Sequence, residues 1–192
     1  NIDCKTVSFP DYENPSSTLV KMYLAGEFGK KPGDVNAFAA SVFYTVDRYA
    51  SFKANWGEFY NNGGTIVSGR YTTSNAVHQC SKLPESEWEA FLEWLYDFEY
   101  HKMGSPRPDA VFYLDVPPRI TGALMSGRYE GDESKKDIHE RNQEYLYRCY
   151  EMGIYCCENL GFYRIPCLDE SGAMLSKETI SDAIFRQIQL ML

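Results

Sequence analysis

No stretch of the 192-residue sequence holds the roughly 20 consecutive apolar residues that a membrane-spanning helix requires. The first residues, Asn1-Ile2-Asp3, carry neither a cationic lead nor an apolar run, so we do not expect them to form a secretory signal peptide. They also lack a methionine, so the sequence as given need not start where the natural chain starts. Basic residues are few, with 19 Lys and Arg against 27 Asp and Glu. The resulting net charge of −8 disfavours nonspecific nucleic-acid binding, so we expect neither a membrane nor a nucleic-acid partner.

The sequence also lacks cysteines at the spacing of a zinc site. The sequence has six cysteines, which are Cys4, Cys80, Cys149, Cys156, Cys157 and Cys167. Their spacing resembles no zinc ligand set, so we assign no metal ligand and predict reduced thiols in a cytoplasmic protein. There is no internal repeat and no low-complexity tract. The length fits one domain, and we expect residues 1–192 to form it.

Short apolar segments alternate with longer segments of helical periodicity. The segments predicted to be strands are residues 4–10, 65–68, 110–116 and 163–167. The predicted helices are a short one begun by Ser16 or Ser17 and ended at Gly26, and residues 35–60, 74–80, 84–100, 120–128, 137–160 and 176–192. Such alternation predicts an α/β fold, a three-layer structure in which helices cover both faces of a parallel sheet.

Two groups of residues in the first third of the chain could bind a ligand. Residues 9–13 (Phe-Pro-Asp-Tyr-Glu) leave the first strand at its carboxyl end, where ligands sit in open α/β sheets. A simple strand exit with a packed aromatic is the alternative. Tyr44 and Arg48 are four residues apart on a helix, so they could stack on a base and hydrogen-bond its carbonyl. The alternative there is a core tyrosine beside a solvated Asp-Arg step.

Two further groups carry positive charge. Arg70 follows the strand 65–68, and small polar residues then open a helix, as at a phosphate and base site. The amide of Asn75 donates and accepts at once, which suits a pyrimidine edge. A plain polar connector explains this segment equally well. Residues 128–140 combine basic residues, a glycine and acids, as a lid over phosphates does, and the alternative is a solvated loop between helices.

The order of these motifs is more specific than any one of them. Phe-Pro-x-Tyr at the first strand exit is followed by an aromatic-x-x-Asp-Arg helix. Arg-Tyr-x-x-Ser-Asn-Ala then follows a strand, and Pro-Asp precedes an apolar strand that ends Leu-Asp-Val-Pro-Pro. This series covers essentially the whole chain and resembles the thymidylate kinases. The resemblance implies the fold of a P-loop NTPase of the nucleoside monophosphate kinase type, with five parallel strands.

The resemblance also implies roles for individual residues. Those that match the family's dTMP site are Phe9, Tyr12, Tyr44, Arg48, Arg70, Ser74, Asn75 and His78. Among them, Tyr44 matches the aromatic that stacks on thymine, Arg48 the arginine that binds its carbonyl, and Arg70 the phosphate-binding arginine. His78 stands where a bulky aromatic crowds the sugar and disfavours a ribonucleotide. The residues that match the lid are Arg128, Lys135, Lys136, Asp137 and Glu140. Arg70 and Arg128 are the two with an implied catalytic role.

The sequence departs from the family pattern in two places. Gly69 replaces the aspartate of the family's Asp-Arg-Tyr motif. This implies that the reaction is slower, and it implies less about dTMP binding. There is also no Gly-x-x-x-x-Gly-Lys-Ser/Thr loop, and the first strand matches the family's second. We expect a natural N-terminal segment of roughly 25–30 residues to supply the missing strand and loop, because omitting a central strand would orphan two rows of backbone groups. The 192 residues alone are expected to be inactive.

The function expected of the full-length protein is phosphoryl transfer from ATP to dTMP, giving dTDP, with Mg²⁺ as cofactor. Its small-molecule partners are then dTMP and ATP. A homodimer is expected because the family pairs through helices and the helix at residues 35–60 carries surplus aromatics. Two rival interpretations are a noncatalytic nucleotide-binding paralogue and a kinase for another nucleoside monophosphate.

Overall fold

The computed structural model describes residues 3–128, 132 and 136–191. Its strands are β1 (Cys4–Ser8), β2 (Thr65–Gly69), β3 (Phe112–Asp115) and β4 (Tyr163–Pro166). Its α-helices are α1 (Thr18–Leu24), α2 (Ala37–Ser51), α3 (Gly57–Asn61), α4 (Thr72–Cys80), α5 (Trp88–Tyr96), α6 (Pro118–Arg128), α7 (Gln143–Asn159) and α8 (Lys177–Met191). Short 3-10 and π-helical segments are η1 (Pro15–Ser17), η2 (Pro32–Asp34), η3 (Phe52–Trp56), η4 (Glu85–Glu87) and η5 (Asp97–Lys102).

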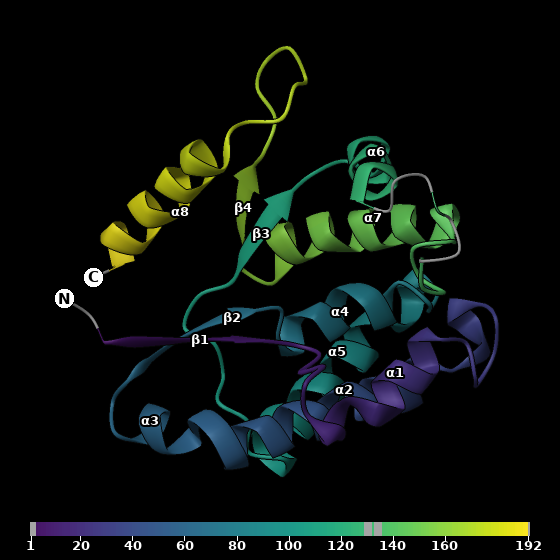
Figure 1. Ribbon diagram of the computed structural model, residues 1–192, viewed down its shortest axis with the longest axis vertical. Helices are drawn as coiled ribbons and strands as arrows, with labels where there is room; N and C mark the ends of the chain where they lie inside the picture. Colours follow the sequence, from purple (N-terminus) through teal and green to yellow (C-terminus); the bar gives the residue numbers. More distant parts are fainter. Residues whose placement is uncertain (1–2, 129–131, 133–135, 192) are drawn as a thin grey trace.

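The strands form two parallel pairs. In the first pair β1 runs beside β2, from Cys4 opposite Thr65 to Ser8 opposite Gly69. In the second, β3 runs beside β4, from Phe112 opposite Tyr163 to Asp115 opposite Pro166. Helices join the strands of each pair. Figure 1 shows α4 and α5 below α7, and the β3–β4 pair to the left of α7. The predicted α/β fold with parallel strands is confirmed, and the described strands make two two-stranded sheets.

The long helix predicted at residues 35–60 is found as α2, η3 and α3 in succession. It begins after Asn36, whose side-chain oxygen accepts a hydrogen bond from the backbone N–H of Ala39 (2.8 Å). The π-helical turn η3 brings the Phe52 carbonyl so close to residue 57 that a Cβ there would lie 2.5 Å from its oxygen. Gly57 therefore permits the switch from π-helical to α-helical geometry.

The prediction of a helix at residues 137–160 is wrong for its first six residues. The helix α7 begins at Gln143, because the side chain of Asn142 caps it by accepting from the N–H of Tyr145 (2.9 Å). Residues 138–141 form turns instead of a helix. The side-chain cap at Asn142 therefore determines where the helix begins, although the helical periodicity of the sequence starts earlier.

The largest apolar cluster joins α4, α5 and α7. Buried residues from these helices include Ala76, Phe91, Leu95, Met152 and Cys156. Burying such side chains stabilises the fold by about 1.5–3 kcal/mol for each large one. This packing fixes α4 against its neighbours, and α4 carries much of the site described next. Among the described helices, none is long and apolar enough to span a membrane.

Candidate functional site

The carboxyl ends of β1 and β2 meet at the site. The backbone N–H of Phe9 donates to the carbonyl of Gly69 (3.0 Å), so the chain is still paired where it leaves β1. The buried ring of Phe9 packs against that of Tyr71, with centroids 6.0 Å apart. The predicted strand exits at residues 9–13 and 69–71 therefore lie side by side.

Asp47 anchors the loop that follows β1. Its buried carboxylate accepts from the backbone N–H of Asp11 (2.8 Å) and from the hydroxyl of Ser16 (2.7 Å). Both oxygens are thus used to hold the loop that carries Tyr12 against α2. The sequence suggested a solvated Asp-Arg step as one alternative at this position, and the burial of Asp47 overturns it.

The next residue, Arg48, is equally buried and forms an ion pair with Glu99 on η5. Thr45 donates to the same carboxylate (2.7 Å), so the guanidinium and its partner are held in one place by α2. Arg48 also lines the pocket described below. A guanidinium fixed in this way keeps its remaining N–H groups in a constant direction.

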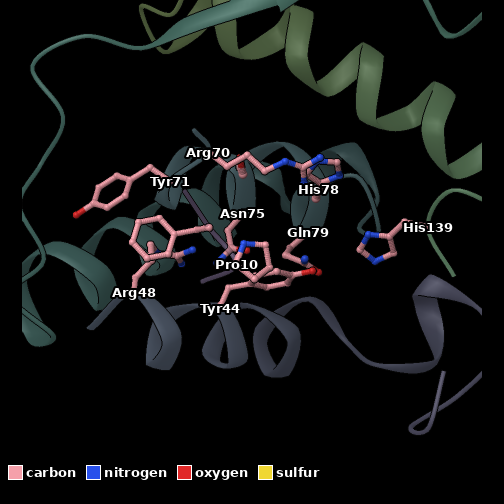
Figure 2. A pocket seen from close by; sticks show the side chains of 11 residues that line it. Pro10, Tyr44, Arg48, Arg70, Tyr71, Asn75, His78, Gln79 and His139 are labelled. Carbon is pink, nitrogen blue, oxygen red and sulfur yellow. The ribbon is translucent and has the colours of Figure 1, made fainter. Parts of the chain in front are cut away.

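Arg70 lies directly after β2 and has a left-handed backbone conformation, with φ at +67°. Its carbonyl accepts a hydrogen bond from the hydroxyl of Ser68. The left-handed region is unfavourable for a residue with a Cβ, by roughly 1–2 kcal/mol. The exposed side chain extends over the pocket toward His78 (Figure 2). The backbone thus directs a cation over a pocket that is otherwise mostly neutral.

The helix α4 supplies the inner wall. The amide nitrogen of the buried Asn75 donates to the carbonyl of Ser41 (3.3 Å). One turn further, Gln79 is 1% exposed, and its side-chain oxygen has no hydrogen-bond partner among the described residues. A buried amide oxygen without a partner is unfavourable by about 1–3 kcal/mol, and a ligand donor would satisfy it.

These residues enclose one pocket. It is lined by Phe9, Pro10, Tyr44, Arg48, Arg70, Tyr71, Ser74, Asn75, His78, Gln79 and His139. All the residues that the sequence assigned to a dTMP site, except Tyr12, are brought together here, from three separate parts of the chain. In Figure 2, Tyr44 lies on the side opposite Arg70, and Asn75 and Gln79 lie between them.

Tyr12 and part of the predicted lid line an adjoining hollow. Tyr12 is 50% exposed. The residues around that hollow are Tyr12, Lys21, Leu24, Ala25, Lys136, Asp137 and Arg141. Burial, followed by the charge of Asp137, raises the pKa of the Tyr12 phenol, while Arg70 lowers it, so these groups lie within electrostatic reach of one another.

The predicted Asp-x-x-Glu element of the lid is a reciprocal turn. The N–H groups of His139 and Glu140 both donate to one carboxylate oxygen of Asp137 (2.8 Å each). The N–H of Asp137 donates in return to the carboxylate of Glu140 (3.2 Å). Burial raises the pKa of Asp137. This turn sets His139 against the pocket. Arg128 ends α6, and Lys135 lies outside the described residues.

The two histidines of the pocket are uncharged. Burial lowers the pKa of His78 to about 3 and that of His139 to about 2, and the charges of Arg70 and Lys82 add to the effect. Their rings stack, with centroids 6.0 Å apart. Burial also raises the pKa of the Tyr44 phenol, which stays protonated. The pocket therefore combines one exposed guanidinium, aromatic rings and neutral polar groups, which suits a flat polar ring that carries an anionic group.

Sequence reasoning missed Asp47, Gln79, Glu99 and His139. Gln79 falls one helical turn after Asn75, so the spacing could have indicated it. The roles of Asp47 and Glu99 depend on partners that are distant in the sequence, and no local signal marks them.

Comparison with known proteins gives a consistent result. A family model described as thymidylate kinase matches residues 4–159. The chain is similar to the thymidylate kinase of Mycobacterium tuberculosis, with 26% identity over 141 residues that cover 72% of this chain and 64% of that protein. For the thymidylate kinase of Dictyostelium discoideum, identity is 24% over 143 residues, which cover 74% of this chain and 57% of that protein. The aligned chain thus spans between 57% and 64% of the length of these two relatives. The chain also matches the solved structure of thymidylate kinase from Candida albicans, with a TM-score of 0.60 and 15% sequence identity. The match covers 97% of this chain and 80% of the Candida albicans chain, so the two share a fold.

Proposed function

The chain belongs to the thymidylate kinase family, and from this premise we propose that the whole protein transfers a phosphoryl group from ATP to dTMP, giving dTDP. One observation carries the proposal. Residues from the ends of β1 and β2, from α2 and from α4 meet in a single pocket, with Arg70 on one side and Tyr44 on the other.

In the proposed complex the acceptor phosphate lies at Arg70 and the thymine ring against Tyr44. Arg70 offers charge-assisted hydrogen bonds to phosphate oxygens, and the aromatic ring offers a stacking face. Arg48 donates to a base carbonyl, and Asn75 and Gln79 use their amides on the polar edge of the base. Support for Gln79 comes from its buried oxygen, which needs a donor.

The transfer step needs positive charge around the γ-phosphate. Arg70 holds the acceptor phosphate in place, and Arg128 is proposed to approach from the lid. Mg²⁺ with ATP would neutralise charge on the phosphates. At such sites it is bound through one or two carboxylates together with the phosphates. The sequence indicated no metal ligand, but Asp115 at the end of β3 could supply one. Its Oδ2 atom accepts from Arg164 (2.8 Å), whereas its buried Oδ1 atom has no hydrogen-bond partner in the described structure.

We also propose that a strand and a phosphate-binding loop from a segment preceding Asn1 complete the sheet. Among the described strands, β2 is hydrogen-bonded to β1 alone and β3 to β4 alone. Val67 on β2 is 54% exposed and Leu114 on β3 is 49% exposed, which is unusual for strands of a helix-covered parallel sheet. A strand between β2 and β3 would pair both edges, and a helix following the loop would cover these side chains on the face of the sheet. Residues 1–192 would then be the larger part of one domain.

A homodimer is the proposed assembly. Phe38, Val46 and Tyr49 lie along α2 and are exposed, although they are large and apolar. Trp94 extends this surface, since its ring packs on Phe38 with centroids 4.6 Å apart. A second copy would remove these side chains from water. Sedimentation of the wild type and of Val46→Glu at micromolar concentration tests the proposal, which a monomeric wild type would contradict. A cytoplasmic location is proposed from the enzyme class and from the free thiols.

The function is tested in two stages. Calorimetry measures dTMP binding to these 192 residues, with dCMP as the comparison ligand, and dTMP is expected to bind more tightly. A coupled assay then measures dTDP formation by the protein extended with its upstream coding sequence. Binding without turnover in the extended protein would contradict the kinase assignment and favour a nucleotide-binding paralogue.

A further inference from the structure

Lys82 is a cation placed among neutral groups next to the pocket. It follows α4, and its ammonium donates to the hydroxyl of Tyr23 on α1 (2.8 Å) and to the carbonyl of Val35 (3.1 Å). It also lies over the ring of Tyr23, 5.0 Å from the centroid. Within the described ranges, no carboxylate lies at ion-pair distance from it. The hydroxyl of Tyr23 is therefore its main polar contact.

The same hydroxyl reaches the wall of the pocket. The Tyr23 oxygen is 2.8 Å from Nε2 of His139 and 3.3 Å from the carbonyl of Pro32. His139 lines the pocket, and its other ring nitrogen, Nδ1, has no partner among the residues that the structure describes. Lys82, Tyr23 and His139 thus form a continuous hydrogen-bonded chain from α4 to the ligand site.

Proton counting links the two ends of this chain. A phenol has one proton to donate. While Lys82 donates to the Tyr23 oxygen, that proton goes to Nε2 of His139, the nearer acceptor, and the ring carries its own proton on Nδ1. If Lys82 is a neutral amine, it can accept the phenol proton. The Tyr23 oxygen then accepts from Nε2, and Nδ1 becomes an acceptor.

We propose that Lys82 is a positioning residue that acts through the Tyr23 hydroxyl to set the tautomer of His139. It thereby decides whether this wall of the pocket donates or accepts a hydrogen bond. That the ligand is a nucleoside monophosphate rests on the function proposed above. The coupling between Lys82 and His139 does not depend on it.

The electrostatic surroundings place this change near neutral pH. Burial lowers the pKa of Lys82 to about 7, while Cys149 on α7 raises it. His139 on the turn and His78 on α4 both face the chain and are neutral, because burial lowers the pKa of each far below 7. Arg70 adds positive charge beside the two rings. Lys82 therefore changes its charge near pH 7. His139 stays neutral, and its one ring proton only moves from one ring nitrogen to the other.

Asp137, on the same turn as His139, also raises the pKa of Tyr23, and the other groups near the chain are neutral or hydrogen-bonded elsewhere. Tyr23 keeps its proton, since burial raises its pKa. On α7, the hydroxyl of Tyr145 donates to the carbonyl of His78 (2.7 Å), and burial raises the pKa of its phenol too. Arg148 is bound to the carbonyl of Leu83 (2.6 Å). None of these groups competes with Lys82 for the proton near pH 7.

The test is ¹⁵N NMR of the histidine side chains in the unliganded chain between about pH 6 and about pH 8, a range that brackets the lowered pKa of Lys82, about 7. In the wild type, Nδ1 and Nε2 of His139 are expected to exchange protonated and unprotonated character with a midpoint near 7. Lys82→Met and Tyr23→Phe should each abolish this exchange. Lys30→Met is the control. It removes the charge of an exposed lysine and should leave the exchange at His139 unchanged.

A wild type whose His139 tautomer is constant over this range would overturn the proposal, and so would an unchanged transition in Lys82→Met. If Lys82→Met does not fold, Tyr23→Phe, which keeps the ring, decides the matter alone. Calorimetry with dTMP on the same wild-type sample tests the proposed function separately. A failure to bind dTMP would reject that function and leave the tautomer result standing.

Discussion

Arg48 and Glu99 form an ion pair in which the side chains are 2% and 0% exposed. The two residues are 51 positions apart, on α2 and η5. Thr45 donates to the same carboxylate, so no oxygen of this network depends on water for its hydrogen bonds. The pair both joins two helical segments and fixes a guanidinium that lines the pocket.

Removing one partner of this pair should be more harmful than removing both. Arg48→Met leaves a buried carboxylate alone, which should lower the free energy of unfolding by about 3–5 kcal/mol. Arg48→Met combined with Glu99→Met should recover part of that loss. Urea unfolding of the two single variants and the double variant measures the coupling. Strictly additive losses would show that the ion pair does not act as a unit.

Arg70 allows its backbone and its side chain to be tested separately. Arg70→Gly and Arg70→Ala both remove the guanidinium, so both should weaken dTMP binding by about 1.5–3 kcal/mol. Since φ is +67° at this position, the glycine variant should be more stable than the alanine variant by about 1 kcal/mol. Calorimetry and urea unfolding measure the two effects. Equal stability of the variants would show that the left-handed backbone carries no strain.

Gly69 stands where the family pattern has an aspartate, next to the proposed phosphate site at Arg70. A Cβ at this position would lie 3.3 Å from the hydroxyl oxygen of Ser8, so Gly69→Asp needs only a small shift of that side chain. In the full-length protein with saturating Mg²⁺ and ATP, we expect Gly69→Asp to raise kcat about tenfold, or roughly 1.4 kcal/mol. The carboxylate can accept from metal-bound water, and dTMP affinity should hardly change. An equal or lower kcat in steady-state kinetics would mean that another carboxylate already fills this role.

The two neutral histidines predict how stability depends on pH. An unfolded histidine takes up a proton as the pH falls through about 6.5, whereas His78 and His139 remain neutral in the fold until the pH approaches their lowered pKa values of about 3 and about 2. The unfolded chain thus binds more protons, and each histidine lowers the free energy of unfolding by up to about 1.4 kcal/mol per pH unit below about pH 6.

His78→Gln should remove one such contribution from the slope. Urea unfolding at about pH 5 and about pH 6 measures it, with His101→Gln, at an exposed position, as the control. The same slope in wild type and His78→Gln would contradict the burial of a neutral imidazole at this position.

Much of the fold was predictable because its signals are local. The strand segments are short and end at or near a proline or glycine, and the periodicity of residues 35–60 identified a helix whose start Asn36 caps. Residues 137–142 were not predictable in this way. Their apolar spacing continues that of α7, but Asn142 and Asp137 use their side chains to hold turns, and such competition with helix formation is decided by geometry.

In the candidate site, too, the features with local sequence signals were predictable and the tertiary contacts were not. Motif order placed Tyr44, Arg70 and Asn75 together, and the structure brings them to one pocket. The burial of Asp47 and the pairing of Arg48 with Glu99 are tertiary contacts, and a charged pair 51 residues apart in sequence has no periodicity to reveal it. His139 enters the pocket only because a turn replaces the predicted helix at residues 137–142.

The most direct test of the account is the affinity for dTMP of the wild type and of Tyr44→Ala, measured by calorimetry. The thymine ring is proposed to lie against Tyr44, so the variant should bind dTMP more weakly by about 1–3 kcal/mol, the usual loss for a base stack. Tyr147→Ala removes an exposed tyrosine from α7, away from the pocket lining, and should bind as the wild type does. Unchanged dTMP affinity in Tyr44→Ala would contradict the assigned base site, and a wild type that does not bind dTMP would contradict the proposed substrate itself.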